Sequence, residues 1–146
     1  MEQVIDLSRF ISAHKHTYND ALSEIRNGKK KTHWMWFIFP QIAGLGRSFT
    51  AQYYEINSPE EAKAFLNDRY LGGNLIEISS ALMRLETNDP TRVFGKPDDM
   101  KLRSCMTLFA SVSEDGSVFH QVIDKYFSGV PDHRTIEILD SGIFQN

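Results

Sequence analysis

The clearest structural signal in the chain is the stretch SPEEAKAFL, residues 58–66. Ser58 is a favoured N-cap residue, Pro59 suits the first helical position, and Glu61 completes the pattern of a capping box. Apolar residues then recur at the spacing of one helical face: Ala62, Phe65 and Leu66. The stretch predicts a short amphipathic helix that packs one face against a core.

Most of the chain on either side repeats this combination of a cap and helical spacing. In chain order we expect further helices over residues 7–13, 17–27, 48–54, about 75–86, 90–94, 97–110, about 119–127 and 133–139. Gly28, Gly95 and Gly129 each follow one of these stretches, where glycine favours the end of a helix.

The segment HWMWFIF, residues 33–39, allows two structures. Aromatic and β-branched residues suit a buried strand, and equally a helix that is buried on most sides. We favour the helix because the chain offers no convincing partner strand. Pro40 ends the segment in either case.

Together these elements predict an all-α fold, a compact single domain of about seven to nine short helices. The domain spans residues 1–146, with a core over about residues 7–139 and a flexible C-terminal tail. A chain of 146 residues, 41% of them hydrophobic, is long enough to bury a core of its own. We expect the core to gather around five side chains: Trp34, Phe37, Leu82, Phe109 and Phe127.

Composition and charge argue against several classes of protein. The net charge of −3 gives no global indication of a nucleic-acid partner. No apolar run approaches the ~20 residues of a membrane span, and the start of the chain does not resemble an export leader. Cys105 is the single cysteine, so no intramolecular disulfide can form. We therefore expect a cytoplasmic protein without a membrane partner.

The sequence contains none of the familiar catalytic motifs, neither a nucleophile elbow nor a P-loop. No histidine and cysteine spacing predicts a metal site, and the sequence leaves the cofactor unknown. Cys105 falls on an apolar helical face and is expected to be a core residue. His14 and His16, two positions apart, point to different faces of a helix and so do not form a metal site together. We expect them at the surface or in caps.

The strongest candidate for a functional segment runs from His33 to Ser48. Gly44 and Gly46 let backbone amides approach a ligand, Arg47 supplies a fork that matches phosphate or carboxylate oxygens, and Ser48 begins a helix. Trp34 or Trp36 can stack on a ring. A purely structural interpretation is equally open, in which the tryptophans are core and Arg47 is solvated.

A second polar group, residues 98–104, is expected to join this loop in one site, with His33 at its edge. Arg103 would add bidentate charge, and His33 or Asp98 would act as general base if a reaction occurs. The competing interpretation is that Asp98 and Asp99 cap their helix and one of them pairs with Arg103. The expected ligand-binding residues are Trp34, Trp36, Gln41, Gly44, Gly46, Arg47, Ser48, Lys101 and Arg103.

The same two segments carry a family resemblance. The matching blocks there are His33-Trp34-Met35-Trp36-Phe37, Phe39-Pro40-Gln41, Gly44-Leu45-Gly46, Ser48, Lys101-Leu102-Arg103-Ser104 and Met106-Thr107-Leu108-Phe109. Shorter blocks match elsewhere: Arg9-Phe10, Glu61-Ala62, Leu71-Gly72 and Phe94-Gly95. In these blocks the chain resembles the bacterial domain-of-unknown-function 1810 family, over about residues 7–139. The resemblance implies a single-domain, all-α fold, and the family brings no established activity with it.

Two functions therefore stay open. In the first, the protein binds or acts on an anionic, nucleotide-like small molecule that carries phosphate or carboxylate. In the second, it is a non-catalytic interaction module that uses the aromatic-rich segment as a partner surface. A pocket beside one tryptophan and Arg47 favours the first function, and a flat exposed apolar patch favours the second.

Overall fold

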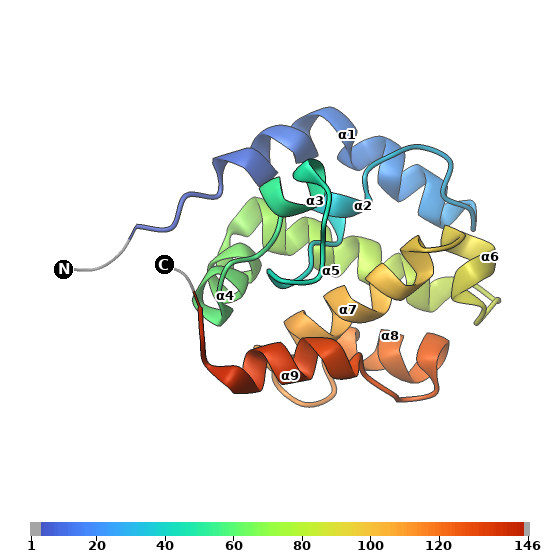
Figure 1. The fold of residues 1–146 in the computed structure, drawn as a ribbon. Helices are drawn as coiled ribbons and strands as arrows, with labels where there is room; N and C mark the ends of the chain where they lie inside the picture. The colour runs from blue at the N-terminus through green and yellow to red at the C-terminus, as the bar shows by residue number, and fades with distance from the viewer. Residues whose placement is uncertain (1–3, 145–146) are drawn as a thin grey trace.

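The structure, a computed structural model, describes residues 4–144, and the last two residues of the predicted tail lie outside this range. Within it the chain forms nine helices and no strand (Figure 1): α1 Ser8–Arg26, α2 Met35–Ile38, α3 Phe49–Tyr53, α4 Pro59–Asn67, α5 Arg69–Arg84, α6 Pro90–Phe94, α7 Asp98–Ser111, α8 Val118–Phe127 and α9 His133–Ser141. The predicted all-α fold is confirmed.

Helix α5 holds the molecule together. It packs against α1, α4 and α8, while α7 packs against α8, α4 and α9. Figure 1 shows α1 along one edge of the molecule, α9 along the opposite edge, and α5 and α7 between them. No helix of the described residues is long and apolar enough to cross a membrane.

Helix α1 corrects the prediction of two short helices over residues 7–13 and 17–27. It is one helix of 19 residues, because its buried stripe continues straight through the polar His-Lys-His segment. His14 is buried rather than exposed, with a 2.9 Å hydrogen bond between Nε2 and the Phe37 carbonyl. The prediction of a surface role for His14 is therefore wrong, since a partner from α2 satisfies its ring.

The tryptophan-rich segment 33–39 is core, and its helical part is the single turn α2. Trp34 is 1% exposed, and its ring packs against Phe39 and Phe94. Of the five predicted core side chains, all but Phe127 are buried, and Phe127 packs partly buried against the same core. Cys105 is fully buried as expected, and burial raises the pKa of its thiol well above the usual value.

The start of α4 was predicted from the local sequence, and the start of α5 was not. Ser58 caps α4 by accepting the Glu61 N–H at 3.1 Å, as predicted. The Glu61 carboxylate does not return to complete the capping box, because Arg9 and Asn57 donate to it instead. Helix α5 begins at Arg69, capped by the Asp68 carboxylate, and not near residue 75. The sequence does not indicate this start, because the adjacent Gly72 and Gly73 disfavour a helix interior.

Candidate functional site

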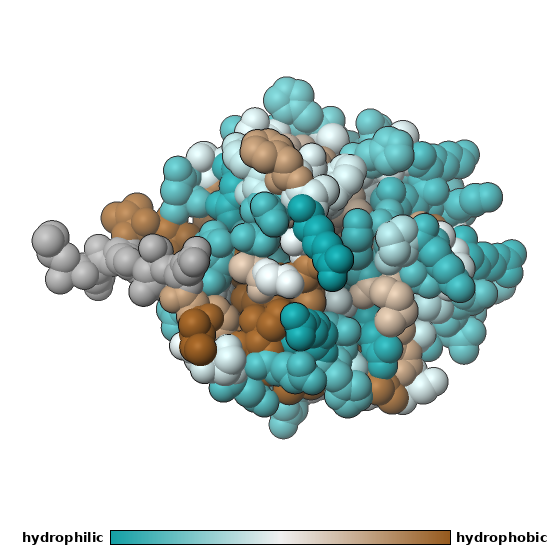
Figure 2. All heavy atoms as spheres, in the orientation of Figure 1, coloured by the Kyte–Doolittle hydropathy of each residue, from teal (hydrophilic) through white to brown (hydrophobic). Residues whose placement is uncertain are grey.

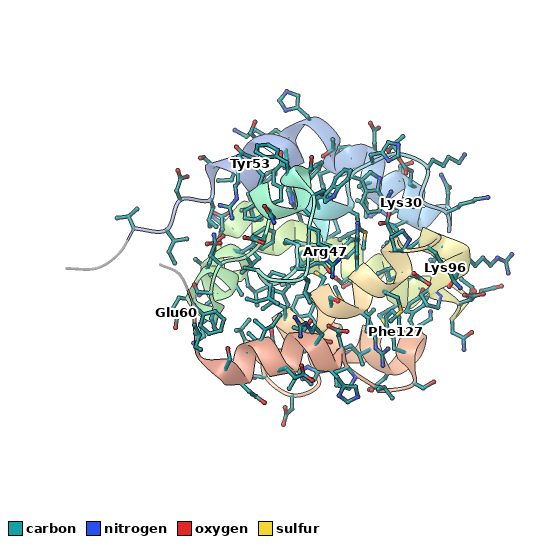
Figure 3. All side chains as sticks on the ribbon, viewed as in Figure 1. Lys30, Arg47, Tyr53, Glu60, Lys96 and Phe127 are labelled. Carbon is teal, nitrogen blue, oxygen red and sulfur yellow. The ribbon has the colours of Figure 1, made fainter. Side chains whose placement is uncertain are left out.

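A cleft of about 320 Å³ lies between the 41–48 loop and the first turns of α7 and α9. Its lining residues are Gln41, Leu45, Gly46, Arg47, Ser48, Ala51, Pro97, Met100, Lys101, Ser104, Asp132 and Arg134. Figure 2 shows strongly hydrophilic side chains on either side of a hydrophobic patch near the middle of this face, and Figure 3 places Arg47 over the same region. We call this the cationic cleft.

The 41–48 loop is held in place by its own backbone. Ala43 donates to the Ile56 carbonyl and Ile56 donates to the Gln41 carbonyl, both at 2.8 Å. Gly46 lies so close to α3 that a Cβ there would stand 2.5 Å from the Ala51 Cβ. This glycine is therefore required for packing of the loop on α3, whatever it does for a ligand.

Positive charge converges on the cationic cleft from three separate segments, through Arg47, Lys101 and Arg134. Within residues 4–144 the exposed Arg47 side chain makes no hydrogen bond or ion pair. Asp132 is the one carboxylate among the lining residues, and it accepts the N–H and the hydroxyl of Thr135 as the cap of α9. The cleft therefore presents a net positive charge.

Two of these cations have weak partners. The Lys101 ammonium lies 3.5 Å from Asp98 and 5.8 Å from the centre of the Trp36 ring. Arg134 approaches Glu137 at 3.9 Å, with both side chains largely exposed. Such an exposed pair contributes little, so Arg134 remains available to a ligand.

Arg103 and Gly44, both predicted in the site, lie outside it. The Arg103 side chain turns away to donate to the Val130 carbonyl at 2.9 Å and to cover the Phe127 ring. It also pairs with neither Asp98 nor Asp99, so the competing interpretation of Arg103 is wrong as well. Gly44 has a φ of +105° and lines a separate cavity near Ile138.

The two tryptophans differ in what they can contact. The buried Trp34 offers no exposed ring face, and its indole N–H donates to Glu24 at 3.1 Å. Trp36 is half-buried and lines a small cavity behind Gln41 and Gly46. The structure thus contradicts a ligand-stacking role for Trp34 and places Trp36 next to the cleft.

Neither predicted general base lines the cationic cleft. His33 is exposed and is not among the lining residues. The Asp98 carboxylate is engaged by Lys30 at 3.1 Å and by Lys101 at 3.5 Å. Asp99 is buried and accepts the Thr91 hydroxyl at 2.7 Å, which ties α6 to α7.

Two charged lining residues, Asp132 and Arg134, come from a segment that the sequence-based site did not include. The only sequence signal there is the N-cap of α9, which says nothing about what that helix packs against. Their arrival in the cleft follows from the docking of α9 on α7, with Asp132 N–H donating to the Thr107 hydroxyl at 2.9 Å. Among the described residues no group of histidine, cysteine and acidic side chains is placed to hold a metal ion.

Comparisons with known proteins agree with the fold. No curated protein matches this chain. The crystal structure of the conserved hypothetical protein Rv1873 from Mycobacterium tuberculosis is similar, with a TM-score of 0.90 and 41% identity over 92% of this chain and 96% of that one. The profile of the family described as a protein of unknown function, DUF1810, matches residues 4–139. The chain therefore belongs to the DUF1810 family.

Proposed function

We propose that the protein binds a small molecule with a phosphate or carboxylate group in the cationic cleft. The observation that supports this most is the convergence of Arg47, Lys101 and Arg134 on one cleft whose single carboxylate is already hydrogen-bonded. Guanidinium groups match phosphate and carboxylate oxygens bidentately. A cleft volume of about 320 Å³ falls at the lower end of the range for small-molecule sites.

The uncharged lining residues favour a ligand with both a polar and an apolar part. Gln41 and Ser48 offer hydrogen-bonding groups beside the cations, and Leu45, Pro97 and Met100 provide an apolar wall. An anionic nucleotide or a similar ring-bearing phosphate combines these features. We therefore propose a nucleotide-like ligand, with the ring against the apolar wall and the phosphate near Arg47.

The proposal is one of binding rather than of a defined reaction. A general base must come within hydrogen-bond reach of the group that it deprotonates. His33 and Asp98 both lie outside the lining of the cationic cleft. A cytoplasmic location is part of the same proposal, because the single buried cysteine calls for no oxidising compartment.

An interaction module built on the tryptophan-rich segment has less support. Within this segment Trp34, Met35, Phe37, Ile38 and Phe39 are buried. Only Trp36 is half-buried, so the segment forms no flat apolar patch for a partner.

The test is a thermal-shift screen of nucleotides, phosphorylated sugars and dicarboxylates, followed by calorimetric titration of the best probe. A ligand that binds the native state raises the melting temperature. Arg47→Ala should raise the dissociation constant by about tenfold or more, because one charge-assisted bidentate contact is lost. The melting temperature of the free variant should stay close to that of the wild type, since Arg47 has no partner within residues 4–144.

Arg69→Ala is the matched control, because Arg69 is also exposed but lies at the start of α5 and outside the cleft. It should leave the affinity unchanged. The proposal fails if no probe shifts the melting temperature, or if Arg47→Ala and Arg69→Ala affect binding equally.

A further inference from the structure

A second cleft, of about 610 Å³, lies between α8 and α9 over the C-terminal half of α7. Its lining residues are Thr107, Ala110, Ser111, Ser113, Asp115, Gly116, His120, Gln121, Ile123, Asp124, Gly129, Pro131 and Ile136. Figure 1 shows α9 at the lower left and α8 at the lower right, both below α7, and both helices pack against α7. The volume falls well inside the range of small-molecule sites.

This second cleft has the opposite charge to the cationic cleft. Asp115 and Asp124 line it, and no lysine or arginine does. Within residues 4–144 neither carboxylate takes part in a hydrogen bond or an ion pair, and both residues are exposed. The charge of the cleft is therefore uncompensated by the protein.

The other polar side chains of the cleft each make a hydrogen bond within the protein, most of them to backbone carbonyls. The Ser113 hydroxyl donates to the Phe109 carbonyl at 2.8 Å, and the Gln121 amide donates to the Gly116 carbonyl at 3.0 Å. The His120 ring is held by a 2.7 Å hydrogen bond between Nδ1 and the Ser117 hydroxyl. The carboxylates are thus the groups most free to meet a ligand.

The remaining wall is apolar, with Ala110, Ile123 and Ile136 facing the same cleft as the carboxylates. An ion that carries both a cationic group and a hydrocarbon part complements this lining. We infer that the cleft between α8 and α9 binds an alkylammonium ion, its charged end near Asp115 and Asp124 and its chain against the apolar wall. This site goes beyond the proposed function, because an anion-binding cleft cannot take the same ligand.

The experiment is calorimetric titration of the full chain with hexylammonium, butylammonium and 1-hexanol. Hexylammonium should bind most tightly, butylammonium more weakly because it buries two methylenes fewer, and the uncharged hexanol more weakly than hexylammonium. Asp124→Asn and Asp115→Asn should each weaken hexylammonium binding several-fold. Both variants should melt like the wild type, since neither carboxylate has a partner in the described chain.

Asp140→Asn is the matched control, because Asp140 is exposed on α9 but does not line the cleft. If Asp140→Asn and Asp124→Asn reduced the affinity for hexylammonium equally, the ion would be attracted by the surface charge in general, and the inference would be overturned. Hexanol binding as tightly as hexylammonium would overturn it too. Arg47→Ala should leave hexylammonium binding unchanged, so this site and the cationic cleft can fail independently.

Discussion

His14 lies in the core, 1% exposed, with both ring nitrogens hydrogen-bonded. Nε2 must donate to the Phe37 carbonyl, so Nδ1 accepts from the Asn74 amide at 3.1 Å. This arrangement requires the neutral ring. Burial lowers the pKa of His14 to about 4, against the opposing influence of the Phe37 hydrogen bond and of Asp68.

The His14 ring predicts a pH dependence of stability. Its pKa is about 4 in the folded protein and 6.5 in the unfolded chain, so the unfolded chain binds the proton more readily. The stabilisation that comes from keeping the His14 ring neutral is complete above pH 6.5. It is lost as the pH falls from 6.5 to 4, which lowers the free energy of unfolding by about 3 kcal/mol. Urea unfolding at several pH values in this window measures the loss.

His14→Gln is the comparison variant, because glutamine can still donate to the Phe37 carbonyl but does not titrate. The other four histidines are present in both proteins, so the difference between the two curves isolates His14. If the free energy of unfolding fell equally steeply between pH 6.5 and 4 in both proteins, the pH dependence would not come from His14.

At the scale of the element, two adjacent glycines in α5 have different roles. A Cβ on Gly72 would stand 1.9 Å from the Leu66 carbonyl oxygen, so α4 and α5 approach each other closely only because this residue is glycine. A Cβ on Gly73 would meet nothing within 4 Å. The contact is with backbone and cannot be relieved by a side-chain rotation.

We predict that Gly72→Ala and Gly73→Ala change stability in opposite directions. Gly72→Ala should lower the free energy of unfolding by about 3 kcal/mol or more, because the helices must separate. Gly73→Ala should raise it by about 0.5–1 kcal/mol, the gain from replacing glycine in a helix interior. Urea denaturation of both variants measures this, and destabilisation of similar size in both would refute the close approach.

Local signals predicted most of the helix starts, and the structure confirms the N-caps Ser48, Ser58 and Asp132. Capping involves residues within one turn, so the sequence contains all of the partners. The start of α5 and the continuity of α1 were missed for the opposite reason. The glycine at position 72 is explained only by its close contact with α4, and the burial of His14 only by its hydrogen bond to the Phe37 carbonyl.

At the scale of the whole molecule, Arg9 ties the start of α1 to the chain that leads into α4. Its guanidinium donates to the Tyr53 and Glu55 carbonyls at 2.9 Å and contacts the Glu61 carboxylate at 2.5 Å. Both charged side chains are mostly buried, at 17% and 9% exposed. A buried pair of this kind makes removal of one partner costly.

Arg9→Met should therefore destabilise the protein by about 2–3 kcal/mol, somewhat below the cost of breaking a fully buried pair. The double variant Arg9→Met, Glu61→Gln should cost less than the sum of the two single changes, because the uncompensated carboxylate is then absent. A thermodynamic cycle from urea unfolding measures the coupling. Strict additivity would show that the two charges do not depend on each other.

The sequence by itself determined the all-α class, most helix boundaries and the family, because periodicity, caps and motif order are properties of neighbouring residues. Only the tertiary structure decided which predicted site residues meet. It buried Trp34, turned Arg103 toward Val130 and brought Arg134 of α9 into the cleft that Arg47 also lines. These outcomes depend on how helices distant in the sequence pack, and the neighbours of a side chain across such a contact are not encoded in its local pattern.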